Sequence, residues 1–536
     1  MEKNKKTASV KPQKQQKTEA KDSIFDKINP KYYLLIIPVL AAIYYSYRYI
    51  ALGFYQDDEI AQYINMLNFW HDPWAILGNG PKPGYKIFMV IPALFSYDYV
   101  LLLNSLIAAV TVYMTYYMLR TYKIPYAIFG ALLLAAQPMF LELSFRSYSE
   151  IFTALLIVTF LILYKKERFF FSSLLCGYIF TVRQEIALLL FVMAIIFFRK
   201  KQYLCILGLA VFPVIYDLLG FIKSGDIMFV LTEMRSVASL NYKTQGLGHY
   251  FKVYIFIVGP VCLSLFLLGF FGFLKDTKKW KEYINQYLLF YIIFISIFVV
   301  QMLTMLNDGP NPGNWRYLLH ISPVCAFFAV IGFNNLADIK FRNTFYIITG
   351  TLAVLVLLFL SYTTDGFKLL DKPEYSKVIF IIVFFGAVIL LRNASRTKYL
   401  DQLSVLLVVL SVVYLLTSTE PKKLSPENIS IKETSEYIDG IPGVNDKEKL
   451  ANHIFIPFYS KSYKSNPDEY KKLDMKNLQE APKGSIVIWD SHYGYRPEFK
   501  NDVQLDVLQK NISGYKFLKQ IVSPDQRFAS FIFEKL

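Results

Sequence analysis

The sequence predicts an all-α polytopic membrane protein that carries a small α/β domain at its C-terminal end. The chain of 536 residues is 54% apolar and 17% aromatic, and its mean hydropathy of +0.35 lies far from that of an average soluble domain. Apolar runs of spanning length follow one another through residues 32–419, whereas residues 1–31 and 420–536 are polar. We therefore expect a disordered basic cytoplasmic tail, a transmembrane domain and an extracytoplasmic domain, in that order.

The positive charge of the chain is explained by membrane topology. The net charge is +16, but the lysines gather in the N-terminal tail and in short loops between apolar runs, so no nucleic-acid partner is expected. The tail lacks an apolar core followed by small residues, which a cleaved signal peptide would have. We expect it to stay on the cytoplasmic side, with the first span as an uncleaved insertion signal.

About 13 membrane-spanning helices are expected from the apolar runs. Each run is long enough, or nearly long enough, to cross the hydrocarbon core, although several are short. The expected spans are 32–52, 97–119, 124–143, 149–164, 168–182, 185–198, 203–222, 250–274, 286–306, 317–337, 343–361, 376–391 and 399–417.

The loops between these spans predict the orientation. Every second loop is basic, as in "KKER" (165–168) and "KDTKKWK" (275–281), and "DIKFR" (338–342) and "RNASRTK" (392–398) follow the same pattern. The intervening loops are acidic or rich in Gly and Pro, as in "NDGPNPGN" (307–314). The basic loops are expected in the cytoplasm, so an odd number of spans leaves the C-terminal domain outside. Short loops and the lack of an endoplasmic-reticulum retrieval signal favour a bacterial inner membrane.

The four cysteines predict neither a disulfide framework nor a zinc site. Cys176, Cys205, Cys262 and Cys325 all fall within apolar runs and form no Cys-x-x-Cys or Cys/His ligand spacing. We expect them to pack between helices as small apolar residues.

The C-terminal segment changes to short β-like runs separated by turns. These runs are "HIFIPFY" (453–459), "GSIVIWD" (484–490) and "FASFIFEKL" (528–536). We interpret "IWDSHYG" (488–494) as a strand that ends in a turn.

A carboxylate cluster directly follows the first span. Asp57, Asp58 and Glu59 precede the amphipathic stretch "IAQYINMLNFW" (60–70), so one aspartate could cap a helix that lies along the interface. Two adjacent aspartates are more than a cap requires. They also fit a general base for an acceptor hydroxyl, or ligands for a divalent cation. The whole loop of 53–86 is longer than a connector needs.

Four short motifs in a fixed order carry a family resemblance. The acidic pair, the surface helix and the Lys82-Pro83-Gly84-Tyr85 segment together resemble the GT-C glycosyltransferases, multispanning enzymes that use polyprenyl-phosphate-linked sugars. "LSFRSYSEIF" (143–152) and "TVRQE" (181–185), which has Gln184 where the family has proline, are similar to segments of the GPI- and N-glycan-type mannosyltransferases. "NWRYLLHISP" (314–323) is similar to a segment found there and in the aminoarabinose and protein O-mannosyl transferases.

The resemblance implies the GT-C fold and an inverting glycosyl transfer on the extracytoplasmic face. A mannose-like sugar would pass from a polyprenyl-phosphate donor to a hydroxyl of a glycan, lipid or protein acceptor. Asp57 or Asp58 would be the catalytic base, and we favour Asp57 by its position in the loop. The residues expected to bind substrate are Glu59, Lys82, Tyr85, Arg146, Glu150, Arg183, His249, Arg316 and Tyr317.

The residues themselves leave alternatives for these roles. The three arginines stand at the outer ends of spans, where they could hold a lipid phosphate or simply snorkel to the interface. Glu150 and Glu185 could pair with the arginines two to four residues before them and serve architecture. His249 could contact the acceptor or be an interfacial polar residue.

Two other functions are weighed against glycosyl transfer. A lipid or sugar transporter, or a flippase, would place ionisable residues at mid-membrane in broken helices, whereas here they cluster at helix ends. An oligosaccharyltransferase or polymer ligase would need an Asp-x-Asp metal motif in the loop of 223–249, which offers only Asp226 and Glu233. A divalent cation, Mg²⁺ or Mn²⁺, stays open as a cofactor at the acidic cluster.

Overall fold

The computed structural model describes residues 23–337, 362–364, 369–373 and 400–536, apart from Asn79, Pro81, Asn241, Thr277, Glu420, Lys464 and Ser465. Several sequence predictions lie outside these described residues. They are most of the basic tail, the expected spans at 343–361 and 376–391, and the loops at 338–342 and 392–398.

Six helical segments within the described residues are long and apolar enough to cross a membrane. They begin with Pro30–Ile50, a 3-10 turn that continues into α1 (Ile36–Ile50), and end with α19 (Leu400–Ser418). Between these lie α4 (Tyr97–Thr121), α10 (Tyr203–Ser224), α15 (Leu288–Met305) and the segment Trp315–Asn335, formed by the 3-10 turn η6 (Trp315–Ile321) and α16 (Ser322–Ala337). The chain is thus a multi-pass membrane protein, as its hydropathy predicted.

Two further expected spans are sharply bent. The run at 124–143 forms α5 (Ala127–Ala135) and α6 (Pro138–Ser144), which meet at 66°. The run at 250–274 forms α12 (His249–Val258) and α13 (Pro260–Phe270), which meet at 117°. Each second helix begins with proline, which lacks the amide needed to continue the preceding helix. Counting each bent pair as one span raises the number within the described residues to eight.

Shorter helices fill the middle of the chain. The predicted runs at 149–164, 168–182 and 185–198 appear as α7 (Ser149–Lys165), α8 (Phe169–Val182) and α9 (Ala187–Arg199). The acidic loop contains the expected surface helix, α2 (Asp58–Asn68). It also contains the start of an apolar helix that was not predicted, α3 (Pro83–Phe95). The remaining helices of this part are α11 (Phe229–Ala238) and α14 (Trp280–Gln286).

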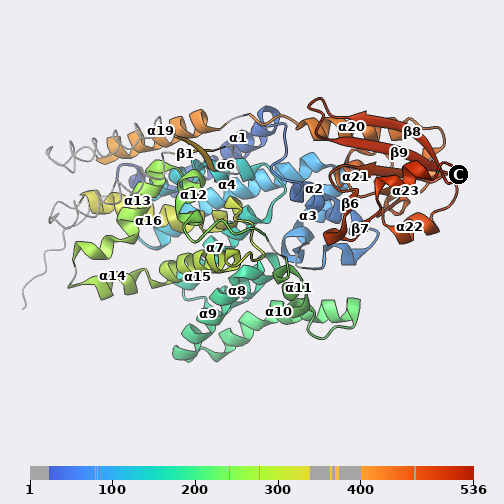
Figure 1. Cartoon of the computed structure of the whole chain (residues 1–536). Coiled ribbons are helices and arrows are strands. Elements are labelled where there is room, and N and C mark those ends of the chain that lie inside the picture. Colours follow the sequence, from blue (N-terminus) through green and yellow to red (C-terminus); the bar gives the residue numbers. More distant parts are fainter. Residues whose placement is uncertain are drawn as a thin grey trace, which may run out of the picture.

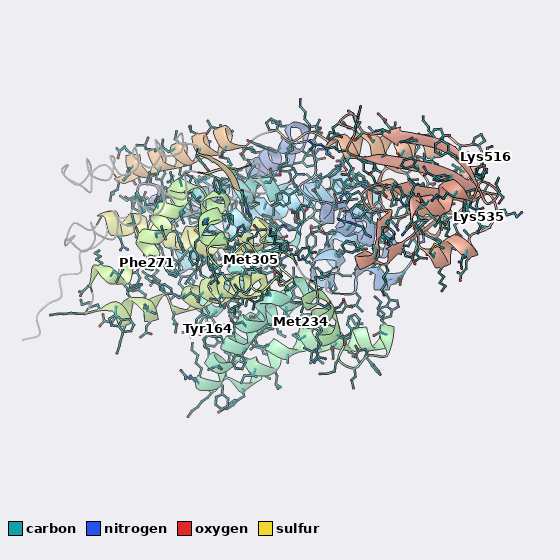
Figure 2. The ribbon with its side chains drawn as sticks, viewed as in Figure 1. Tyr164, Met234, Phe271, Met305, Lys516 and Lys535 are labelled. Carbon is teal, nitrogen blue, oxygen red and sulfur yellow. The ribbon has the colours of Figure 1, made fainter. Side chains whose placement is uncertain are left out.

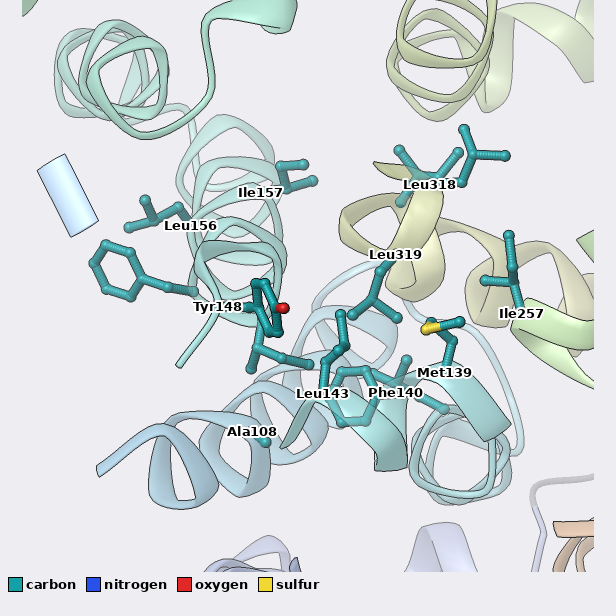
Figure 3. Packing of buried hydrophobic residues seen from close by; sticks show 14 of the residues in the cluster. Ala108, Met139, Phe140, Leu143, Tyr148, Leu156, Ile157, Ile257, Leu318 and Leu319 are labelled. Carbon is teal, nitrogen blue, oxygen red and sulfur yellow. The ribbon is translucent and has the colours of Figure 1, made fainter. Parts of the chain in front are cut away.

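The transmembrane core lies where α4, α6, α7 and η6 meet. Figure 3 shows Leu143, Tyr148 and Leu319 pointing toward one another there, and all three are buried. All four cysteines are buried and free, as expected. Because apolar side chains fill the middle of α4, α6 and α7, charged side chains gather at the ends of these helices.

A pair of glycines brings α13 and α16 into close contact. A Cβ added at Gly269 would lie 1.9 Å from the Phe328 carbonyl oxygen, and one at Gly332 would lie 2.0 Å from that of Leu265. Only residues without a Cβ permit this approach, which is a common device between membrane helices.

The C-terminal domain is a five-stranded mixed sheet with helices. The strand order is β4-β3-β5-β9-β8, in which β3 is parallel to both of its neighbours and the remaining pairs are antiparallel. The strands are β3 (Lys449–Ala451), β4 (Tyr470–Lys471), β5 (Ile486–Asp490), β8 (Tyr515–Val522) and β9 (Ala529–Lys535). The helices are α20 (Pro426–Asp439), α21 (Phe455–Tyr459), α22 (Met475–Glu480) and α23 (Leu505–Lys510). Two small antiparallel ladders complete the described strands, β1 (Tyr362–Thr364) with β2 (Leu369–Pro373) and β6 (Tyr495–Arg496) with β7 (Asn501–Asp502).

Two of the three predicted strands of this domain are confirmed as β5 and β9, but the third prediction was wrong. The run at 453–459 forms α21 instead of a strand. Pro457 has no amide to donate to a ladder, which disfavours an inner strand. The helix instead packs Phe455 on Phe54 of the acidic loop, with ring centroids 4.9 Å apart.

The C-terminal domain rests directly on the acidic loop. The hydroxyl of Tyr463 donates to Asn68 at the end of α2 (2.7 Å), and the amide of Gly53 donates to the Lys422 carbonyl (2.9 Å). Figure 1 shows α2 and α3 between the transmembrane helices, such as α4 and α7, and the C-terminal sheet with its helices, and Figure 2 places Lys516 and Lys535 on the far side of the domain. The carboxylate cluster therefore lies at the junction of the two parts.

Candidate functional site

The three acidic side chains of the cluster point to three different environments. Asp57 occupies the N-cap position of α2 but makes no side-chain cap hydrogen bond; its Oδ2 accepts instead from the Tyr493 hydroxyl. Asp58 pairs with the Arg316 guanidinium, and Glu59 is buried. Successive residues at a helix start point about 100° apart, which explains the divergence. Capping therefore does not account for Asp57.

Glu59 is the structural member of the cluster. Its carboxylate accepts from the amide of Tyr55 (3.1 Å) and the hydroxyl of Tyr97, and it lies 3.4 Å from Arg146 Nη1. Its side chain is only 1% exposed, whereas that of Asp58 is 59% exposed. Of these two, Asp58 is the one that an incoming substrate can reach.

Arg146 fastens the acidic loop to α6. It pairs with Glu142 one turn earlier (2.9 Å) and donates to the Gly53 carbonyl (2.7 Å). Glu142 also receives Lys422 from the chain entering the C-terminal domain (2.8 Å). Pairing between Arg146 and Glu150 was considered from the sequence and is not found, because the helix breaks after Ser144 and Arg146 turns back to α6.

Glu150 instead joins the other two arginines. Its Oε1 lies 3.1 Å from Arg183 Nη1 and 3.5 Å from Arg316 Nε, and Arg183 Nε also contacts Glu185 (2.6 Å). The Arg183–Glu185 pair was considered from the sequence, and the structure contains it. The two guanidiniums and Glu150 are almost completely buried, where a charge must be paired to be tolerated. Simple snorkelling to the interface does not describe these arginines.

Tyrosine rings line this pair of arginines. The Arg316 guanidinium lies 4.4 Å from the ring centroid of Tyr148, and Tyr317 stands between the two arginines, 5.5 Å from Arg316 and 5.4 Å from Arg183. Tyr317 was predicted as a site residue and Tyr148 was missed, although it lies within the quoted motif at 143–152. Cation–π contacts hold the planar guanidinium groups in fixed orientations.

Lys82 stands at the start of α3 in the left-handed conformation (φ 59°). Burial and the nearby charge of Arg183 lower the pKa of Lys82 to about 8, against the opposing effect of Glu150. Tyr85 and Lys86 follow on the first turn of α3 and are fully buried. No hydrogen-bond partner of Lys86 Nζ is present among the described residues. The start of α3 therefore lies close to Arg183 and Arg316.

An apolar cavity of about 460 Å³ is lined in part by Pro83 and Gly84, the two residues that follow Lys82. It is lined by the 3-10 turn at Pro73–Ile76 together with α3, α8 and α10. Its lining includes Trp74, Pro83, Ile87, Tyr178, Phe212 and Leu219.

His249 lies apart from the ion pairs. Its Nε2 contacts the Gly313 carbonyl oxygen at 2.7 Å. Gly313 belongs to the loop that leads to Arg316, so His249 supports that loop; no contact between His249 and the carboxylate cluster is recorded within the described residues.

The C-terminal domain adds residues that the sequence did not single out. Besides Tyr493, they are His453 and His492, whose imidazoles both contact Glu427 Oε1, at 3.0 and 2.6 Å. Burial raises the pKa of Glu427, but the hydrogen bonds from the two histidines outweigh it and lower the value to about 2. In the sequence, His492 and Tyr493 belong to "IWDSHYG", which was interpreted as a strand that ends in a turn.

Comparison with known proteins finds solved structures with a similar fold. No protein-family model and no curated protein sequence matches the chain. Among solved structures it is similar to ArnT from Cupriavidus metallidurans bound to undecaprenyl phosphate, with a TM-score of 0.57 and 11% identity over 94% of this chain and 98% of the other. The apo state of ArnT gives a TM-score of 0.54 with the same identity and coverage. The GT-C fold expected from the motifs is thus confirmed.

Proposed function

We propose that this protein is an inverting GT-C glycosyltransferase that moves a sugar from a polyprenyl-phosphate donor to an acceptor hydroxyl on the extracytoplasmic face. One observation carries the proposal, the arrangement at the start of α3. Pro83 and Gly84, which follow Lys82, line an apolar cavity, and Lys82 lies near enough to Arg183 and Arg316 to feel their charges. Arg316 in turn pairs with Asp58 of the acidic cluster. A lipid-linked sugar phosphate needs this sequence of environments, first apolar, then cationic, then polar. The similarity to the fold of ArnT, solved with undecaprenyl phosphate, supports the same class of donor.

The donor phosphate is assigned to Lys82 and Arg316. Arg316 Nη1 is buried and makes no hydrogen bond within the described residues, so it retains a donor for an incoming anion. Lys82 lies close enough to feel the charges of Arg183 and Arg316. A bound phosphate would reduce the mutual repulsion of these cations and bring the first isoprene units to the apolar cavity.

Asp57 is assigned as the general base. Asp58 is already paired with the Arg316 guanidinium, whereas Asp57 faces the junction with the C-terminal domain and accepts a hydrogen bond from one tyrosine. The Asp57 carboxylate takes the proton of the acceptor hydroxyl, and the hydroxyl oxygen attacks the anomeric carbon from the face opposite the phosphate. The bond from the anomeric carbon to the phosphate oxygen breaks, and the polyprenyl phosphate leaves with its charge held by Lys82 and Arg316.

The finer features of this function are proposals from the motifs. The sugar is mannose-like, the acceptor is a hydroxyl of a glycan, lipid or protein, and the site faces outward from a bacterial inner membrane with the N-terminus in the cytoplasm. No step is assigned to Mg²⁺ or Mn²⁺, because Asp57, Asp58 and Glu59 turn to three separate partners instead of one common point.

The test is sugar transfer in proteoliposomes given labelled polyprenyl-phosphate mannose and a crude acceptor pool. We expect Asp57→Asn to reduce transfer by about 10²- to 10⁴-fold, Asp58→Asn to reduce it less, and Arg316→Ala to impair it. Asp98→Asn is the matched control, because Asp98 is half exposed and pairs with Arg48 outside the cluster. Donors carrying other sugars, run in parallel, identify the sugar.

Two outcomes would contradict the proposal. Wild-type protein that transfers no sugar from any lipid-linked donor would exclude it. Full activity of Asp57→Asn together with loss in Asp58→Asn would move the base to Asp58.

A further inference from the structure

Two of the five histidines of the chain meet at one carboxylate in the C-terminal domain. His453 follows β3 by two residues and His492 follows β5 by two residues. These strands are parallel neighbours, with Ala451 opposite Ile488. The carboxyl ends of adjacent parallel strands meet at the same edge of a sheet, so the sheet itself delivers both imidazoles to one point. Glu427, in the first turn of α20, faces them there.

The three side chains have the spacing of metal ligands. His453 Nε2 lies 3.0 Å and His492 Nδ1 2.6 Å from the same Glu427 oxygen, and all three atoms lie within 4.8 Å of one another. Ligands at about 2.0–2.2 Å from a tetrahedral ion are separated by about 3.3–3.5 Å, so only small side-chain rotations are required. The site is partly enclosed, because the side chain of His453 is 1% exposed while those of Glu427 and His492 are 30% and 36% exposed.

A further carboxylate, that of Asp490, lies beside these three side chains. Asp490, the last residue of β5, is fully buried and lies close enough to both imidazoles to feel their charges. Its Oδ1 accepts from the amides of His492 (3.0 Å) and Tyr493 (2.6 Å), while its Oδ2 is buried with no hydrogen-bond partner among the described residues. A buried carboxylate oxygen without a donor is costly, and a cation in this place would relieve the cost.

We propose that Glu427, His453 and His492 form a binding site for a divalent first-row transition-metal ion, with Zn²⁺ as the ion that their chemistry matches. Two imidazoles and a carboxylate are ligands that zinc accepts and that Mg²⁺ and Ca²⁺, which prefer oxygen alone, do not favour. The site is separate from the acidic cluster of the proposed glycosyl transfer and shares no ligand with it.

Metal binding changes the protonation of both histidines. The amide of Phe455 donates to His453 Nδ1 at 3.3 Å, so in this hydrogen-bonded arrangement the proton of the ring is on Nε2. An ion at Nε2 requires the proton on Nδ1, and that one long contact is given up. His492 loses the proton that it donates to Glu427. Coordination therefore requires the ring proton of His453 to move to Nδ1 and the proton between His492 and Glu427 to be displaced.

The site has an entry path and a structural consequence. A cavity of about 420 Å³ between α2 and the C-terminal domain is lined in part by His453, Asn452 and Tyr493. The ring of His492 stacks on that of Tyr493 at 4.1 Å, and the Tyr493 hydroxyl donates to Asp57. An ion held by His492 would thus fix the turn that carries Tyr493 against α20.

The test uses the full-length protein in detergent, stripped with EDTA, incubated with Zn²⁺, desalted and analysed for metal by mass spectrometry. We expect one zinc per wild-type chain and loss of stoichiometric zinc in His453→Gln and His492→Asn. Glu427→Gln should bind at least 10-fold more weakly in a chelator competition. His71→Asn is the matched control, because His71 is exposed in the outer loop, and it should bind like wild type.

A second measurement separates lost ligands from lost folding. Zn²⁺ should raise the melting temperature of the wild-type protein and of His71→Asn but not that of His492→Asn, whose circular dichroism should match wild type without metal. Co²⁺ should give the visible absorption of a four- or five-coordinate site in wild type and in His71→Asn, but not in His492→Asn. A chain that binds less than one-tenth equivalent of zinc, or a His453→Gln/His492→Asn double variant that still binds one, would overturn the proposal.

Discussion

At the residue scale, the site is a set of buried charges that neutralise one another. Glu150 is shared by Arg183 and Arg316, and Arg316 extends from it to Asp58 at the surface. Burying such charges is tolerable only when every member has its partner, since the cost of desolvation is large. Loss of one carboxylate therefore affects stability and substrate binding together.

Glu150→Gln should destabilise the protein strongly. It leaves two buried guanidiniums with reduced compensation, a loss of about 3–5 kcal/mol in the free energy of unfolding for a broken buried pair. Thermal unfolding in detergent measures it. Glu282→Gln, at an exposed position on α14, is the control and should leave the melting temperature unchanged. An equally small effect for both variants would show that Glu150 is not needed to neutralise the arginines.

Lys82 should make donor binding pH-dependent. Its pKa is lowered to about 8, so the side chain is charged below pH 8 and loses its proton as the pH rises through that value. The anionic donor favours the charged form, so KM for the donor should rise above about pH 8. In Lys82→Arg, which stays charged, KM should be flat over this range. The same rise in both proteins would assign the titration to another group.

At the element scale, two features shape the transmembrane part. The sharp turn between α12 and α13 depends on Gly259, whose φ of +81° disfavours any side chain, and on Pro260 after it. The contact of α13 with α16 depends on Gly269 and Gly332. α16 continues η6, so the position of Arg316 follows from that helix contact.

Gly269→Ala should push α13 and α16 apart. The added Cβ would lie 1.9 Å from a backbone oxygen, which no rotamer can relieve, so we expect a loss of at least about 1–3 kcal/mol of stability. Gly248→Ala is the comparison, because its nearest neighbour would be a flexible lysine carbon at 3.8 Å. Melting temperatures of the two variants should differ clearly, and equal values would mean that the helices separate at little cost.

At the scale of the whole molecule, the C-terminal domain is part of the site. It supplies Tyr493 to Asp57, and its Tyr463 holds the end of α2. The domain thus forms hydrogen bonds at both ends of α2, the helix that follows the proposed base Asp57. A cavity lined in part by Tyr493 lies at the same junction, where the acceptor of the proposed reaction would approach.

Tyr493→Phe should lower kcat with little change in KM for the donor. The variant keeps the ring that stacks on His492 but removes the hydrogen bond to the Asp57 carboxylate. A hydrogen bond to a charged group contributes about 1.5–3 kcal/mol. If the transition state loses all of this energy, the rate falls roughly 10- to 100-fold. Tyr495→Phe, nearly half exposed on β6, is the control. A wild-type kcat for Tyr493→Phe would show that this contact does not serve the reaction.

The sequence by itself determined the membrane class and most helices, and it singled out acidic and basic residues that the structure brings together, because hydropathy, charge alternation and short motifs are local patterns. Tertiary structure alone decided which charges meet. Arg316 and Asp58 are 258 residues apart in the chain and Tyr493 and Asp57 are 436 apart, so no local pattern could pair them. The pairing of Glu150 with Arg183 and Arg316 instead of Arg146 follows from a helix break and from packing. Buried charge is stabilised by whichever partner the fold brings within reach, and sequence spacing does not specify that partner.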